Sequence, residues 1–80
     1  MNDLIEHATQ LHTTEMGLER IKRNLDIDTD DIVQWCRVKI LADRTIIERK
    51  GKNWYATIDD CQITVNAHSY TIITARKIKK

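Results

Sequence analysis

The sequence has few of the residues that nucleotide and serine chemistry require. Gly17 and Gly51 are its only glycines, and neither GxGxxG nor GxxxxGK[ST] occurs, so the glycine-rich loops that hold phosphates are excluded. Ser69 is the only serine, and it stands in a predicted turn without the elbow motif of a serine nucleophile. We therefore expect neither nucleotide-dependent chemistry nor a serine hydrolase.

Cysteine and histidine are too few and too scattered for a disulfide framework or a metal site. Cys36 and Cys61 are far apart in the chain and lie among apolar neighbours, so we expect buried thiols in a reducing compartment. His7, His12 and His68 do not follow the i, i+4 spacing of a zinc-binding helix. No metal and no cofactor are predicted.

Long apolar runs are also missing. No run of 18 apolar residues occurs, and the apolar pattern at the N-terminus includes Asp3 and Glu6, which is incompatible with a signal peptide. These features predict a cytoplasmic protein that does not enter a membrane. A chain of 80 residues supports one core, so we expect a single domain over residues 1–80.

Aromatic residues are scarce, with two Trp, two Tyr and no Phe. The core must then depend on Ile, Leu and Val, and we expect Trp35 and Trp54 to be core or interface anchors. The 41% apolar and 31% charged residues are typical of a globular chain. Because so small a core gives modest stability unless a partner adds burial, a homodimer is one hypothesis.

The charges that are present divide the chain into two halves. Residues 1–43 carry five basic and nine acidic side chains, whereas residues 44–80 carry eight and three. A basic half can bind phosphate while the acidic half faces solvent or a protein partner. A mixed surface that only keeps the protein soluble is the alternative.

Apolar residues at helical spacing predict three helices in the first half. The first covers about residues 2–11 and the second about residues 14–25, with Thr13 or Thr14 as the N-cap of the second. The third follows an acidic segment in which Asp28 or Thr29 is the expected N-cap. The residues expected to mark their inner faces are Leu4, Ile5, Ala8, Leu11, then Met16, Leu18, Ile21, Leu25, then Ile32, Val33, Cys36 and Ile40.

From Thr45 the apolar period changes to two, which indicates strands. If Asp59-Asp60 is a two-residue turn, Trp54 pairs with Val65 on a core face, and Tyr55 pairs with Thr64 on a polar face. The fold class predicted is α+β, with two or three N-terminal helices packed on one face of a four-stranded antiparallel meander. The expected strands are Thr45–Arg49, Trp54–Ile58, Cys61–Asn66 and Tyr70–Arg76, joined by turns at Lys50-Gly51-Lys52, Asp59-Asp60 and His68-Ser69.

Several side chains are suited to acid–base chemistry or phosphate binding without a metal. We expect His12 to act as the acid or base, with Arg20 and Arg76 beside the phosphate, if the chain cleaves RNA. The competing interpretation is structural, with His12 at a helix boundary and the arginines solvated. The residues expected to bind nucleic acid or a partner are Arg23, Lys50, Lys52, Tyr55, Asn66, His68, Thr71 and Lys77, and the basic tail continues to Lys79 and Lys80.

Three segments resemble a family of small bacterial proteins that have no characterised function. The segments are LHTTEMGLERIKRNL (11–25), RKGKNWYATIDDC (49–61) and ITVNAHSYTIITARK (63–77). The resemblance spans nearly the whole chain, but the family pattern ends in Ala-His-Lys where this chain has Ala75-Arg76-Lys77. A looser resemblance, carried by His12, Arg20 and residues 73–76, is to metal-independent ribonuclease toxins with the barnase, colicin or RelE-like fold.

Two functions follow as hypotheses. The first is a binding or inhibitor module, encoded by a mobile element, that engages a protein, RNA or nucleoprotein partner through the polar sheet face or the basic edge. The alternative is a metal-independent endoribonuclease of the toxin type. The charge division and the small core favour the first, and the absence of metal and nucleotide motifs favours the second.

Overall fold

The computed structural model describes residues 3–27, 29 and 31–78. The predictions that concern Asn2, Asp28, Lys79 and Lys80 lie outside these residues. The elements are α1 (Asp3–Glu6), the 3₁₀ helix η1 (Ala8–Gln10), α2 (Glu15–Leu25), α3 (Ile32–Leu41), β1 (Ile46–Lys50), β2 (Asn53–Ile58), β3 (Cys61–Asn66) and β4 (Ile72–Lys77).

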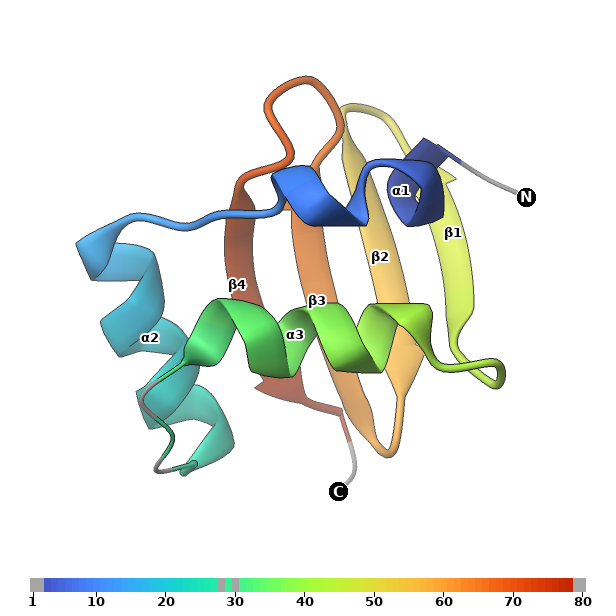
Figure 1. Ribbon diagram of the computed structural model, residues 1–80. Helices are drawn as coiled ribbons and strands as arrows, with labels where there is room; N and C mark the ends of the chain where they lie inside the picture. Colours follow the sequence, from blue (N-terminus) through green and yellow to red (C-terminus); the bar gives the residue numbers. More distant parts are fainter. Residues whose placement is uncertain (1–2, 28, 30, 79–80) are drawn as a thin grey trace.

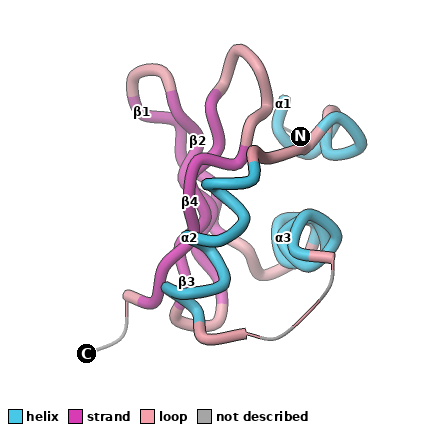
Figure 2. Tube along the Cα trace, turned by 90° about the vertical axis from the view of Figure 1, so that its left-hand side faces the viewer, coloured by secondary structure: helices cyan, strands magenta, loops and turns pink. Residues whose placement is uncertain are grey.

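The α+β fold is confirmed, because the helices all precede a four-stranded antiparallel sheet in the order β1-β2-β3-β4. Helix α3 crosses one face of the sheet, and α2 lies along β4 (Figures 1 and 2). No helix among the described residues is both long enough and apolar enough to span a membrane.

The predicted pairing of the central hairpin is also confirmed. Trp54 pairs with Val65 and Tyr55 with Thr64, as a two-residue turn at Asp59-Asp60 requires. Asp59 and Asp60 both have left-handed backbone angles, with φ of 51° and 64°, which is the geometry of the turn that matches strand twist. The turn chemistry therefore determines which face of β2 and β3 meets the helices.

The last strand begins later than expected, at Ile72 rather than Tyr70. Tyr70 has a left-handed φ of 57°, and Thr71 forms a parallel bridge with His12. The pairing then shifts between Thr64 and Val65, so that Ile73 is an extra residue in β4. This bulge allows Ile72 and Ala75, which are three positions apart, both to be buried.

The first predicted helix is wrong, because one helix over 2–11 is replaced by α1 and η1 with a break at His7. Two tertiary contacts compete with a continuous helix here. The His7 ring stacks on Tyr70 with 4.9 Å between ring centres, and the Ala8 carbonyl accepts a hydrogen bond of 2.9 Å from Arg37 Nε. The break still leaves Leu4 and Leu11 inside the core.

The second helix begins where a cap was predicted, and the third does not. Thr14 Oγ1 accepts a hydrogen bond of 3.0 Å from the Gly17 amide, which confirms a threonine N-cap. In α3 the cap is Asp31, whose Oδ1 accepts from the Gln34 amide at 3.0 Å. Thr29 was therefore wrong as the N-cap of α3; its hydroxyl instead accepts from the Asp31 amide.

The core is aliphatic, as the composition predicted, with two exceptions among the expected inner residues. Met16 is 73% exposed and Ile5 is 37% exposed. The close approach of α2 to β4 explains the first exception, because Gly17 rather than Met16 faces β4. A Cβ atom added at Gly17 would lie only 3.5 Å from the Ile72 carbonyl oxygen. Cys36 is fully buried but Cys61 is only half-buried, which corrects the expectation for the second thiol.

We expect this difference to appear in thiol labelling. Burial raises the pKa of the Cys36 thiol to about 12, so almost no thiolate forms there near neutral pH. Titration of the folded protein with a chromogenic disulfide reagent at pH 8 should modify Cys61 at once and Cys36 only after denaturation. Folding raises the pKa of the Cys36 thiol. The buried neutral thiol therefore contributes to the free energy of unfolding in full below the ordinary thiol pKa, and this contribution is lost as the pH rises toward about 12. Rapid modification of both thiols in the folded state would contradict the burial of Cys36.

Candidate functional site

The face of the sheet opposite α3 is open. Figure 2 shows α1 and α3 on one side of the strands and no helix on the other. Because Trp54, Ala56 and Ile58 of β2 are buried beneath the helices, the alternate residues Asn53, Tyr55 and Thr57 point to the open side. The same alternation places polar residues of β1, β3 and β4 on this face.

A shallow hollow of about 290 Å³ lies on this open face. The sheet register explains its composition, because Glu48 pairs with Tyr55, and Gln62 pairs with Arg76. Lys50 lies two residues beyond Glu48 on the same side of β1. The hollow is lined by Glu48, Lys50, Tyr55, Gln62 and Arg76.

The chemistry of the hollow is mixed. The Tyr55 side chain is half-buried and supplies the one aromatic ring. The Lys50 ammonium and the Arg76 guanidinium supply two positive charges against the single negative charge of Glu48. Gln62 adds an amide that can both donate and accept. An aromatic ring, two cations and two acceptors on a solvent-facing sheet suit a planar, negatively charged ligand.

A second polar group lies at the other end of β4, around the loop that joins β3 to β4. Asn66 Oδ1 accepts hydrogen bonds from the amides of His68 and Ser69 at 2.9 and 3.0 Å. The Thr71 hydroxyl contacts Ser69 Oγ at 2.7 Å and His12 Nε2 at 3.0 Å. His12 Nδ1 lies 2.9 Å from the Gln10 carbonyl, to which it donates. The Asn66 side chain thus stabilises the β3–β4 loop through hydrogen bonds to its backbone.

The remaining predicted residues lie elsewhere. Arg20 and Arg23 line a smaller hollow of about 140 Å³ on α2 with Met16 and Glu19. Lys77 lines a third hollow, of about 260 Å³, with Asp59, Asp60 and Cys61. Lys52 is exposed in the β1–β2 turn and His68 is exposed in the β3–β4 loop.

The structure does not bring the three predicted catalytic residues to one point. His12 is hydrogen-bonded to Thr71 just before β4, and Arg76 lies five residues further along the chain, with its backbone roughly 16 Å from that of Thr71 in an extended chain. Arg20 belongs to the separate hollow on α2. The roles of the single residues stay predictions.

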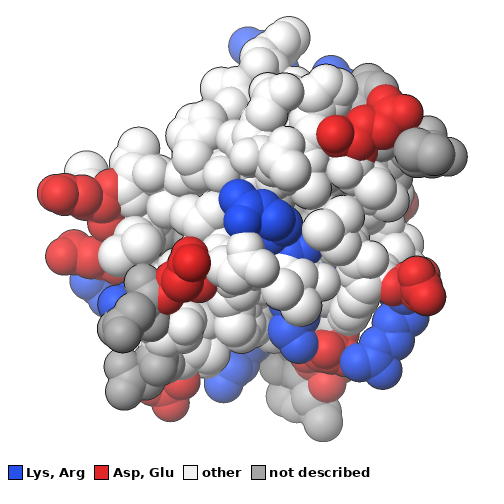
Figure 3. Space-filling view, viewed as in Figure 1, with Lys and Arg blue, Asp and Glu red and all other residues white. Residues whose placement is uncertain are grey.

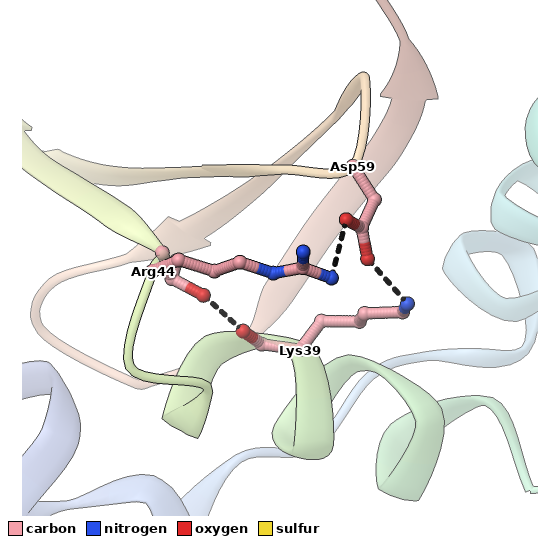
Figure 4. Close-up of polar contacts among 4 residues, drawn as sticks. Lys39, Arg44 and Asp59 are labelled. Atoms are coloured by element: carbon pink, nitrogen blue, oxygen red, sulfur yellow. Dashed lines mark hydrogen bonds and ion pairs between the residues drawn. The ribbon is translucent and has the colours of Figure 1, made fainter.

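A pair of salt bridges near the β2–β3 turn serves the fold. The Asp59 carboxylate accepts from Lys39 Nζ at 2.9 Å and from Arg44 Nη2 at 2.8 Å (Figure 4). The hydrogen bond from Lys39, together with the charge of Arg44, lowers the pKa of Asp59 below its ordinary value. These contacts tie the end of α3 to the turn that sets the sheet register. Among the described residues, no group of three or more His, Cys, Asp or Glu side chains is placed to hold a metal ion.

The fold and the open face define a small α+β protein with a polar, partly basic sheet surface. The chain belongs to the family described as protein of unknown function DUF3781, whose model matches residues 5–76. The resemblance to an uncharacterised family is thereby confirmed. No curated protein and no solved structure shows significant similarity to the chain.

Glu48 and Gln62 are the members of the hollow that the sequence prediction missed. Both lie in predicted strands, but neither is among the residues expected to bind a partner. The signal that identifies them is the strand alternation, because it places Glu48 on the side of Tyr55 once β1 is paired with β2. The sequence predicted a register for the β2–β3 hairpin and placed Thr71 beside Asn66, as the hydrogen bond from the Asn66 amide to the Thr71 carbonyl confirms, but it predicted no register for β1 and β2.

Proposed function

We propose that this protein is a noncatalytic binding module whose open sheet face binds single-stranded RNA in a nucleoprotein partner. The observation that supports the proposal is the hollow in which Tyr55 lies with Lys50 and Arg76, on a face that no described helix covers. Single-stranded RNA presents unstacked bases and a charged backbone together. In the hollow, the Tyr55 ring can stack on a base, and Lys50 and Arg76 can bind the charged backbone.

Each side chain of the hollow has a role in this proposal. The Tyr55 ring stacks on a base, and such stacking contributes about 1–3 kcal/mol per base. Lys50 and Arg76 contact phosphates on either side of that base, because they approach the hollow from the two outer strands β1 and β4. Glu48 and Gln62 accept hydrogen bonds from the amino groups of the base edge.

The charges of the hollow also predict how tight the binding is. Two phosphate contacts give a weak electrostatic attraction that falls with salt, with a slope of log K against log salt of about −1.4. The binding of a short RNA should therefore be modest at physiological salt, and stronger at low salt.

We expect Tyr55→Ala to weaken the binding of a fluorescently labelled, unstructured RNA of mixed sequence about tenfold, measured by fluorescence polarisation. Tyr55→Phe should bind like wild type, because the ring is retained.

Arg76→Ala should weaken binding and lower the magnitude of the salt slope by about 0.7, because one phosphate contact is lost. Glu48→Gln should strengthen binding, because it removes the only negative charge from the hollow.

Arg23→Ala is the matched control, since it removes the same charge from α2 rather than from the sheet. If Arg23→Ala and Arg76→Ala reduce affinity equally, the attraction is general and the sheet face is not the binding site. An absence of binding by wild type at low salt would also overturn the proposal. Running the assay in EDTA and then checking the RNA length tests for cleavage, and shortened RNA would favour the ribonuclease alternative over a noncatalytic module.

A further inference from the structure

The outward side of α3 carries a stripe of exposed residues that the proposed RNA site does not use. Asp31, Gln34, Val38 and Leu41 are all exposed, and their spacing of i, i+3, i+7 and i+10 places them along one line on the helix. Val38 is 56% exposed and Leu41 is 46% exposed. Large aliphatic side chains in this arrangement form the seam of paired helices.

Uncharged side chains cover much of the surface around this stripe. Figure 3 shows the face of the molecule that carries α3, with acidic groups toward the rim, a cluster of Lys or Arg atoms near the centre, and uncharged atoms around that cluster. Figure 2 shows α3 standing out from the sheet on this side. A flat partner can therefore approach the helix along its length.

Opposite charges lie beyond the two ends of α3, at its N-cap Asp31 and at Arg44 in the loop that follows it. Asp31 precedes Val38 by seven residues and Arg44 follows it by six. Arg44 keeps 75% of its side chain exposed although one of its nitrogens contacts Asp59, and a guanidinium has further donors to offer. An antiparallel copy of the same helix, turned about an axis through Val38, would bring each Asp31 toward the Arg44 of the other copy.

We propose that a second copy of this chain docks on α3, in a two-fold symmetric dimer centred on Val38. The self-complementary charges favour a second copy over an unrelated partner, because an isologous interface must match its own reverse. A contact confined to one helix per copy is smaller than the roughly 1,200 Å² of a standard stable interface. The dimer should therefore be weak and concentration-dependent.

Sedimentation velocity over a protein range of roughly 10 μM to 1 mM tests the proposal. Wild type should shift from the monomer mass toward twice that mass, and Val38→Asp should stay monomeric throughout. Met16→Asp is the matched control, because Met16 is 73% exposed on α2, and this variant should dimerise like wild type. Asp31→Ser keeps a capping hydroxyl but removes the charge, so it should weaken the dimer about two- to tenfold.

A cysteine at the symmetry axis gives a second test that does not depend on affinity. Because a residue on a two-fold axis meets its own counterpart, Val38→Cys should form a disulfide-linked dimer under mild oxidation much faster than Met16→Cys or wild type. A wild type that stays monomeric at 1 mM, association that persists in Val38→Asp, or equal cross-linking of the two cysteine variants would each overturn the proposal. The hollow lies on the other side of the sheet, so RNA binding and dimerisation can fail separately.

Discussion

Ile63→Ala should destabilise the protein more than any other single change considered for this chain, by about 3–5 kcal/mol. Ile63 is fully buried on the core face of β3. Its partners across the sheet are Ala56 on β2 and Ala75 on β4, so a large residue fills the space between two small ones. Truncation leaves three alanines side by side, and neither neighbour can extend into the cavity. The cost should therefore fall in the upper part of the usual range for such truncations.

The measurement is thermal and urea unfolding followed by circular dichroism. A loss of this size lowers the melting temperature of an 80-residue domain by about 12–40 °C. The matched control is Ile46→Ala, which makes the same change at a residue of β1 that is 63% exposed, and it should alter stability by less than about 0.5 kcal/mol. Similar losses for the two variants would contradict the proposed position of the core.

Gly17→Ala should destabilise the protein by about 1–2 kcal/mol, although the same change in most helices is stabilising by up to about 1 kcal/mol. A Cβ at Gly17 would lie only 2.4 Å from Thr13 Oγ1 and 3.3 Å from Thr14 Oγ1. The Thr13 hydroxyl is held in place because it donates to the Ile72 carbonyl at 2.8 Å. The threonine must rotate away to admit the methyl group, and β4 then loses this hydrogen bond from the segment before α2.

A double-mutant cycle separates this clash from a general intolerance of the helix. In a Thr13→Ala background the obstructing hydroxyl is gone, so adding Gly17→Ala should be neutral or stabilising. Gly51→Ala is the contrasting control: Gly51 has a φ of 60° and no atom near its added Cβ. Its cost of about 1 kcal/mol comes from backbone strain and should not change when Thr13 is replaced. An equal cost of Gly17→Ala in both backgrounds would show that Thr13 is not the cause.

The sheet was largely predictable because its determinants are local. The period of two after Thr45 identified the strands, and the Asp59-Asp60 turn placed Trp54 opposite Val65, as the structure shows. The bulge at Ile73 was not predictable in this way. It arises because Ile72 and Ala75 are both drawn to the core, and no spacing rule for a regular strand allows both.

The helical half was less predictable, because its ends depend on distant partners. The break at His7 follows from a ring contact with Tyr70 and from the hydrogen bond that Arg37 makes to Ala8. The exposure of Met16 follows from the closeness of α2 to β4, which admits only a glycine at the contact. Periodicity alone assigned Met16 to the inner face because it cannot register how closely two elements approach.

The candidate site was also predictable only in part. The basic and aromatic members, Lys50, Tyr55 and Arg76, could be selected from the sequence as residues that bind phosphate or a base. Their assembly into one hollow with Glu48 and Gln62, and the separation of Arg76 from His12, could not. The sequence gives the chemical type of each side chain, but it does not give the distance between side chains on different strands.

By itself, the sequence determined the α+β class, the point where helices give way to strands, the β2–β3 register and the aliphatic core, because each depends on hydrophobic period or turn geometry over a few residues. Only the tertiary structure decided where the helices break, which residue faces β4, and which polar side chains share a surface. Those outcomes depend on contacts between residues as far apart as Gly17 and Ile72, which no local pattern encodes.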